Sequence, residues 1–127
     1  MKNTQRAFSL VEALSAVAII GVITFLAMPN IISAKKNSET NLAISRAEAI
    51  NVAMVSYVQA YGRTNATNTW ASQTSDQARY ELVAAYLAFA PALEEEYMPS
   101  GYNITLPTTI ATISKVPLSG PEGTIHY

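Results

Sequence analysis

The stretch ALSAVAIIGVITFLAMPNIISA, residues 13–34, lies between Glu12 and Lys35 and contains no charged side chain. As a helix it would be about 33 Å long, which is enough to cross a bilayer. A buried core helix would need apolar partners on every side, and residues 35–127 are too few to supply them. The stretch therefore predicts a membrane-spanning helix near the N-terminus.

A secretory signal peptide is the alternative, because it also combines a basic start with an apolar middle. Cleavage would then follow the small residues Ser33 and Ala34. The pattern fits this class poorly: the apolar stretch is long, Pro29 and Asn30 interrupt the approach to the site, and Ile32 stands where a small residue is expected. Membrane insertion remains the preferred interpretation.

Glu12 places an acid at the start of the apolar run. An ionised carboxylate that enters hydrocarbon costs several kcal/mol unless it has a partner. Cutting the chain between Ala7 and Phe8 would create a positive amine one helical turn before Glu12, on its own chain or on a neighbouring copy. Such a cut would give the acid the cation that it needs.

The run from Arg6 to Glu12, RAFSLVE, followed by an apolar helix, resembles the processing site of type IV prepilins and pseudopilins. The shared features are a short basic leader, a small residue before the cut, Phe8 after it, Glu12 four positions on, and Pro29 within the helix. The family usually has Gly where this chain has Ala7. The resemblance implies that a prepilin peptidase cuts after Ala7 and methylates the amine of Phe8, and that Glu12 guides assembly by pairing with the terminal amine of an adjacent subunit.

Gly21 and Pro29 fall where such pilins loosen the helix. Gly weakens a helix through excess backbone freedom, and Pro does so through a lost donor and a clash. Both residues are also common in ordinary membrane helices, so a functional flexible segment and a plain membrane span stay open as interpretations.

The positive charges leave the orientation open, because Lys2 and Arg6 precede the span while Lys35 and Lys36 follow it. The family resemblance implies a cytoplasmic leader and a single pass through the bacterial inner membrane. The body would lie in the periplasm or outside the cell before it joins a filament.

Composition argues against several other classes of protein. The net charge is -1 with scattered basic residues, so no direct contact with nucleic acid is expected. No cysteine is present for disulfides or thiolate sites, and the only histidine, His126, lies in a predicted strand. The run Glu94-Glu95-Glu96 is interpreted as a solvated turn. We expect no catalytic residue, no metal site and no cofactor.

The body begins with a continuation of the helix, over about residues 35–61, which Gly62 ends. Its apolar stripe has spacings of three and four and consists of Ala43, Ala47, Ile50, Met54, Val58 and Tyr61. Val52 and Val55 lie off this stripe, which indicates either a contact surface toward neighbouring subunits or additional packing. Residues 64–75 are predicted to form an exposed polar loop anchored by Trp70.

A second helix is predicted over about residues 75–89, from a capping box of Thr74 and Gln77 to a stop at Pro91. Strands are predicted within about 102–127, from alternation at residues 102–106, then over 110–116 and 124–127. The fold class is therefore α+β: a long N-terminal membrane-spanning and assembly helix packed against a small C-terminal antiparallel sheet. We divide the chain into a leader at 1–7, the apolar half of the helix at 8–34 and a pilin-like head at 35–127.

The function predicted from the resemblance is that of a non-enzymatic structural subunit of a type IV pilus-like filament. A short body without a C-terminal cysteine pair favours a pseudopilin of a type II secretion-like system. The alternatives are a major or minor type IV pilin in adhesion, motility or DNA uptake, and a secreted or membrane-anchored binding module. The implied partners are copies of the chain, minor pilins or pseudopilins, the prepilin peptidase, and a platform membrane protein with its assembly ATPase.

Overall fold

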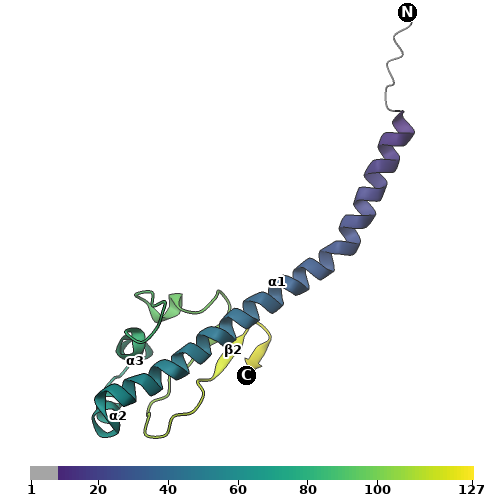
Figure 1. The fold of residues 1–127 in the computed structure, drawn as a ribbon. Coiled ribbons are helices and arrows are strands. Elements are labelled where there is room, and N and C mark those ends of the chain that lie inside the picture. Colours follow the sequence, from purple (N-terminus) through teal and green to yellow (C-terminus); the bar gives the residue numbers. More distant parts are fainter. Residues whose placement is uncertain (1–8) are drawn as a thin grey trace, which may run out of the picture. The chain divides into compact units, whose positions relative to one another are not determined.

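A computed structural model of the chain describes residues 9–127. The predicted cleavage site at Ala7 and Phe8 lies outside this range. The chain forms two compact units, one that extends to Asn37 and one from Ser38 to Tyr127, which we call the head (Figure 1). The predicted α+β class is confirmed, with one long N-terminal helix and a three-stranded antiparallel sheet near the C-terminus.

Helix α1 extends from Leu10 to Tyr61, so the predicted continuation as far as Tyr61 is confirmed. Gly62 ends it with a φ of 78°, and the Gly62 N–H donates to the Val58 carbonyl oxygen at 2.9 Å. This left-handed conformation carries little strain for Gly, which explains the stop.

The predicted stripe of α1 is largely confirmed, because Ala43, Ala47, Ile50 and Met54 are buried. Tyr61 is exposed, contrary to the prediction, and two residues outside the stripe, Ala53 and Tyr57, are buried instead. The core face is therefore broader than a spacing of three and four indicates. Val52 is 65% exposed, so the packing interpretation does not hold for it within this chain.

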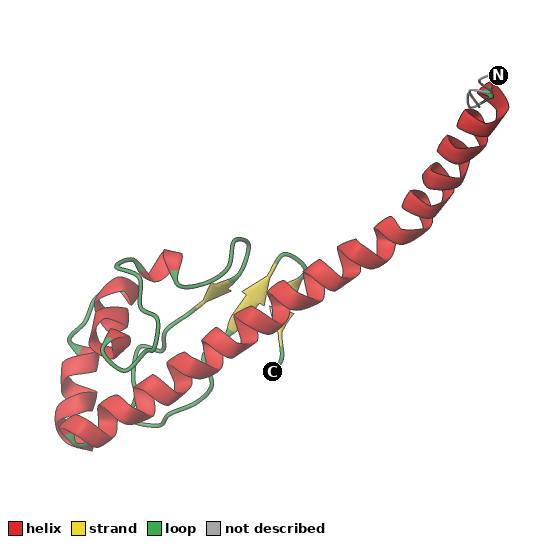
Figure 2. Cartoon of the chain, turned by 45° about the horizontal axis from the view of Figure 1, so that its top comes forward, coloured by secondary structure: helices red, strands yellow, loops and turns green. Residues whose placement is uncertain are grey.

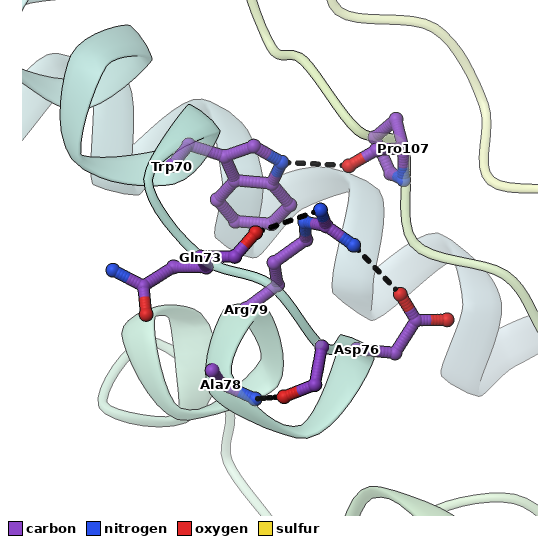
Figure 3. Close-up of polar contacts among 7 residues, drawn as sticks. Trp70, Gln73, Asp76, Ala78, Arg79 and Pro107 are labelled. Atoms are coloured by element: carbon purple, nitrogen blue, oxygen red, sulfur yellow. Dashed lines mark hydrogen bonds and ion pairs between the residues drawn. The ribbon is translucent and has the colours of Figure 1, made fainter.

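The segment predicted as an exposed polar loop is mostly a helix, α2, Arg63–Ala71. Its Asn and Thr residues have low helix propensity, but Ala66 and Trp70, four residues apart on one face, are fully buried. The indole Nε1 of Trp70 donates to the Pro107 carbonyl oxygen at 2.7 Å (Figure 3). Trp70 is thus the predicted anchor, and its packing overrides the local preference for a loop.

The second predicted helix exists as α3, Asp76–Ala84, and is shorter than predicted. Its N-cap is Ser75, whose Oγ accepts from the Ala78 N–H at 3.2 Å, so the predicted cap at Thr74 is wrong by one residue. Arg79 is buried and donates to the Asp76 carboxylate at 3.0 Å and to the Gln73 carbonyl oxygen at 2.8 Å (Figure 3). These bonds fix the turn that joins α2 to α3.

The acidic run forms a short 3₁₀ helix, η1, Glu94–Glu96. Glu95 and Glu96 are exposed, as expected for a solvated turn, but Glu94 is half-buried and its N–H donates to Gln77 Oε1 at 2.7 Å. Burial raises the pKa of the Glu94 carboxyl above its ordinary value of 4.5, and the charges of Asp76 and Glu95 raise it further. The run is therefore partly built into the head.

The sheet has the order β1-β2-β3 and consists of β1 Asn103–Ile104, β2 Leu118–Gly120 and β3 Gly123–Ile125. All neighbours are antiparallel, with Ile104 opposite Leu118 and Leu118 opposite Ile125. The sheet lies in the predicted region, but the predicted strand over residues 110–116 is wrong. That segment is a loop held by its buried ends, Ile110 and Val116.

Asn51 of α1 explains why the chain leaves the strand conformation at this loop. Its Oδ1 accepts from the Val116 N–H at 2.9 Å, and its Nδ2 donates to the Tyr127 hydroxyl at 3.1 Å. The Val116 N–H is therefore used by a helix side chain, and Pro117 has no N–H to offer a strand. Figure 2 shows the strands next to the head portion of α1.

Candidate assembly helix

Helix α1 begins at a side-chain cap. The Oγ of Ser9 accepts from the Glu12 N–H at 3.2 Å, and the Ser9 carbonyl oxygen accepts from the Ala13 N–H at 3.1 Å. Ser9 and Glu12 have the Ser-x-x-Glu spacing of a capping box, a signal that we overlooked in the sequence. The cap fixes where the helix starts and places Glu12 in its first turn.

The first turn is a favourable place for an acid. The helix dipole carries partial positive charge at its N-terminus, and a carboxylate there typically gains about 0.3–1 kcal/mol. This gain is much smaller than the several kcal/mol that an ionised carboxylate loses on entering hydrocarbon. Glu12 therefore still needs a full positive charge beside it when the segment is in a membrane or a helix bundle.

The surface of α1 from Leu10 to Ile32 is apolar on every side. Thirteen large apolar side chains are exposed there: Leu10, Val11, Leu14, Val17, Ile19, Ile20, Val22, Ile23, Phe25, Leu26, Met28, Ile31 and Ile32. At about 1.5–3 kcal/mol for each side chain, their exposure to water would cost roughly 20–40 kcal/mol. That exceeds the net stability of a whole domain, about 5–15 kcal/mol, so the segment needs lipid or protein around it.

The polar groups of this segment are satisfied in a way that suits hydrocarbon. Helical backbone groups bond to one another, and the Thr24 hydroxyl donates to the Ile20 carbonyl oxygen at 2.7 Å. Between Ser9 and Lys35, Glu12 is the only charged side chain. Among the described residues, α1 is the one helix that is long and apolar enough to cross a membrane.

Gly21 and Pro29 both lie inside α1, which is continuous through them. A Cβ built on Gly21 would meet nothing within 4 Å, so nothing in the described part of this chain requires Gly there. Pro29 lacks an N–H, so the Phe25 carbonyl oxygen loses its usual helical donor. A flexible segment at these two residues remains a prediction.

The titratable side chains of the head form no metal-binding cluster within the described residues. Within residues 9–127, no three His, Cys, Asp or Glu side chains lie close enough together to hold a metal ion. His126 is exposed beyond the end of β3. Four side chains of the head have a raised pKa, with burial as the largest cause: Glu94, Tyr57, Tyr80 and Tyr97.

The order of features at the start of the chain matches a known family model. The prokaryotic N-terminal methylation motif matches residues 2–28, which include Glu12, Gly21 and most of the apolar surface described above. Residues 2–28 of the chain are therefore similar to the methylation motif of type IV pilin-like proteins. Comparisons with curated proteins and with solved structures gave no match.

The match and the structure together give the chain a methylation motif at residues 2–28 and an apolar N-terminal helix. Three of the predicted site residues, Glu12, Gly21 and Pro29, lie on α1. Ala7 and Phe8, where cleavage and methylation are predicted, precede the described residues.

Proposed function

We propose that this pilin-like chain is a pseudopilin, a structural subunit of a filament in a type II secretion-like system. The observation that carries the proposal is the pairing of a fully exposed apolar helix surface with a single acid, Glu12, at its start. A simple membrane anchor needs the apolar surface but gains nothing from an acid at its edge. A filament subunit uses the acid to select one register on docking.

In this proposal, residues 1–7 are a leader, and a prepilin peptidase removes it and methylates the amine of Phe8. Residues 8–34 hold the subunit in the bacterial inner membrane by a single pass, with the head, residues 35–127, in the periplasm or outside. The amine of one subunit then neutralises Glu12 of its neighbour. The other partners are minor pseudopilins and a platform membrane protein with its assembly ATPase.

The mass and N-terminal residue of the mature protein, purified from its native envelope, test the proposal. We expect the chain to begin with N-methylated Phe8. A chain that begins at Lys35 would mean that residues 1–34 are an ordinary signal peptide. A chain that retains Met1 would leave a simple anchored protein, and either result would overturn the proposal.

A second experiment separates the secretion machine from a surface pilus. The short head without cysteine supports the former. We expect deletion of the gene to abolish export of one or more folded proteins and to leave surface fibres unchanged. Loss of surface fibres with normal export would assign the subunit to a pilus instead.

A further inference from the structure

The head carries an apolar groove beside α1 that its own side chains do not fill. The groove has a volume of about 250 Å³, and its lining consists of Asn51, Val52, Val55, Ile113, Ser114 and Lys115. Val52 is 65% exposed, although it lies on the head portion of α1. An exposed apolar site of this kind marks a place where another apolar group can bind.

A fixed positive charge lies at the edge of this groove. The Nζ of Lys115 donates to the main-chain oxygen of Tyr127 at 2.6 Å and lies 4.8 Å from the centre of the Tyr127 ring. The Tyr127 hydroxyl in turn donates to the Val116 carbonyl oxygen at 2.6 Å. These contacts hold the ammonium group of the exposed Lys115 in place.

A complementary feature protrudes at η1. Leu93 is 50% exposed and directly precedes η1, and its carbonyl oxygen accepts from the Glu96 N–H at 3.1 Å. Leu93 is the N-cap of η1, and the exposed Glu96 ends η1 three residues later. The chain thus presents one apolar side chain with a carboxylate next to it.

The protruding feature is held firmly against α1. The Arg46 guanidinium donates to the Tyr97 carbonyl oxygen, and the Tyr97 hydroxyl donates to the Arg46 carbonyl oxygen at 3.1 Å. Tyr97 directly follows η1 and is buried. Little conformational freedom is therefore lost when η1 docks on a partner.

The groove and η1 lie on opposite sides of α1. Val55, in the groove, follows Arg46, which holds η1, by nine residues, and at 100° per residue these two side chains point in opposite directions. Figures 1 and 2 both show the head portion of α1 between η1, the short light-green helix of Figure 1, and the loop before β2. A contact between two different faces of identical copies is heterologous, and its repetition builds a ring if the rotation closes and an open helical filament if it does not.

We propose that Leu93 of one copy of this chain inserts between Val52 and Ile113 of the next copy, where its Glu96 pairs with Lys115. This inference rests on the proposed function, because it adds a specific head contact to the filament. The apolar fit and the opposite charges favour a second copy as the occupant. The contact is small and would be weak alone, but packed α1 helices hold neighbouring heads at a high effective concentration.

The absence of cysteine from the chain allows a direct test. Leu93→Cys and Val52→Cys are combined in the full chain, which is expressed in cells with its assembly machinery, and isolated filaments are oxidised. We expect a ladder of disulfide-linked multimers from the double variant and none from either single variant. The matched control combines Leu93→Cys with Tyr61→Cys, since Tyr61 is 59% exposed but, nine residues after Val52, lies about 180° around α1 from it.

Charge reversal gives a second, independent measurement. We expect Lys115→Glu and Glu96→Lys each to lower the yield of filaments about tenfold, which corresponds to about 1.4 kcal/mol. The double variant should recover most of the yield, because the pair is restored with its charges exchanged. Circular dichroism of each purified variant checks that the head is folded.

The outcomes separate this contact from the proposed function. Filaments that begin with N-methylated Phe8 but give no Leu93–Val52 ladder would overturn the head contact and leave the filament assignment intact. A ladder of equal strength in the Tyr61 control would overturn it as well. If the unmodified chain forms no filament, the proposed function fails and this contact fails with it.

Discussion

From Leu10 to Ile32, α1 exposes its apolar side chains on every side, whereas from Ala43 to Tyr57 it buries one face against the rest of the head. The two regions belong to one helix, yet they need different surroundings. The head region finds its partners within the chain, and the N-terminal region must find them in lipid or in other copies. One continuous helix can therefore serve two environments, with side chains suited to each.

The largest expected effect is on assembly, and it comes from a substitution in the N-terminal region, at Glu12. In Glu12→Ala, the amine of the neighbouring subunit would lose its buried partner, at a cost of about 3 kcal/mol or more. We expect at least a roughly hundredfold loss of assembled subunit. Sheared filaments and the membrane fraction are quantified by immunoblot.

The control for this variant is Glu48→Ala, because Glu48 is an exposed acid on the head portion of α1. Its assembly should be normal. Membrane insertion and the fold of the head should be unchanged in both variants. Normal assembly of Glu12→Ala would remove the main physical support for the proposed role of this acid.

The next largest effect is a loss of stability in the head that leaves membrane insertion by the N-terminal region unchanged. Trp70 is fully buried and bonds to Pro107, so Trp70→Ala should lower the free energy of unfolding by about 3–5 kcal/mol. Urea denaturation followed by circular dichroism measures this change, and insertion into the membrane should persist. Val52→Ala, at an exposed position, should change the stability by less than about 0.5 kcal/mol. Equal effects of the two substitutions would contradict the assignment of the core.

A smaller effect on stability tests which residue caps α3 after the turn from α2. Ser75→Ala removes the cap of α3 and should cost about 1 kcal/mol of stability. The same substitution at Thr74, one residue earlier, should have almost no effect. Thermal melts of the two variants side by side give the answer, and a larger loss at Thr74 would favour the cap predicted from the sequence.

The smallest effect is a pH dependence within the head. The raised pKa of Glu94 means that the folded state binds a proton more tightly than the unfolded state, whose pKa is near the ordinary 4.5. The stability that this group contributes is fully present below that value, and it is lost as the pH rises through the folded pKa.

Glu94→Gln should therefore stabilise the head at neutral pH, by less than about 1 kcal/mol, and give no gain at acidic pH. Urea midpoints across the acidic to neutral range measure the difference. Glu95→Gln, at an exposed position in the same run, is the control and should show no such trend. A gain for Glu94→Gln that is the same at every pH would show that ionisation is not its cause.

The comparison also explains which features could be predicted from the sequence. The N-terminal region depends on local composition alone, so its length and its acid, Glu12, can be predicted without knowledge of the tertiary structure. The stop at Gly62 is equally local, because it needs only a residue that tolerates a positive φ. Ser9 could have been recognised as a cap from its spacing to Glu12.

The errors in the head come from contacts that are distant in sequence. Helix α2 was missed because the burial of Trp70, with its bond to Pro107, outweighs the loop preference of the Asn and Thr residues around it. The segment 110–116 has the composition of a strand, but Asn51 takes up the Val116 N–H. The strand β2 forms instead beyond Pro117, where pairing with β1 and β3 becomes possible.

The contacts of Thr40 and Asn51 also bear on the order in which the chain inserts into the membrane and folds. Thr40 meets the Tyr102 hydroxyl across 62 residues, and Asn51 meets Val116 across 65 residues. During synthesis, α1 emerges long before these partners, and contacts of such separation form slowly. Insertion of residues 10–32 depends on nearby sequence alone and can come first. A nascent subunit would then be tethered to the bilayer while its head is still an open chain, and folding would finish at the membrane surface.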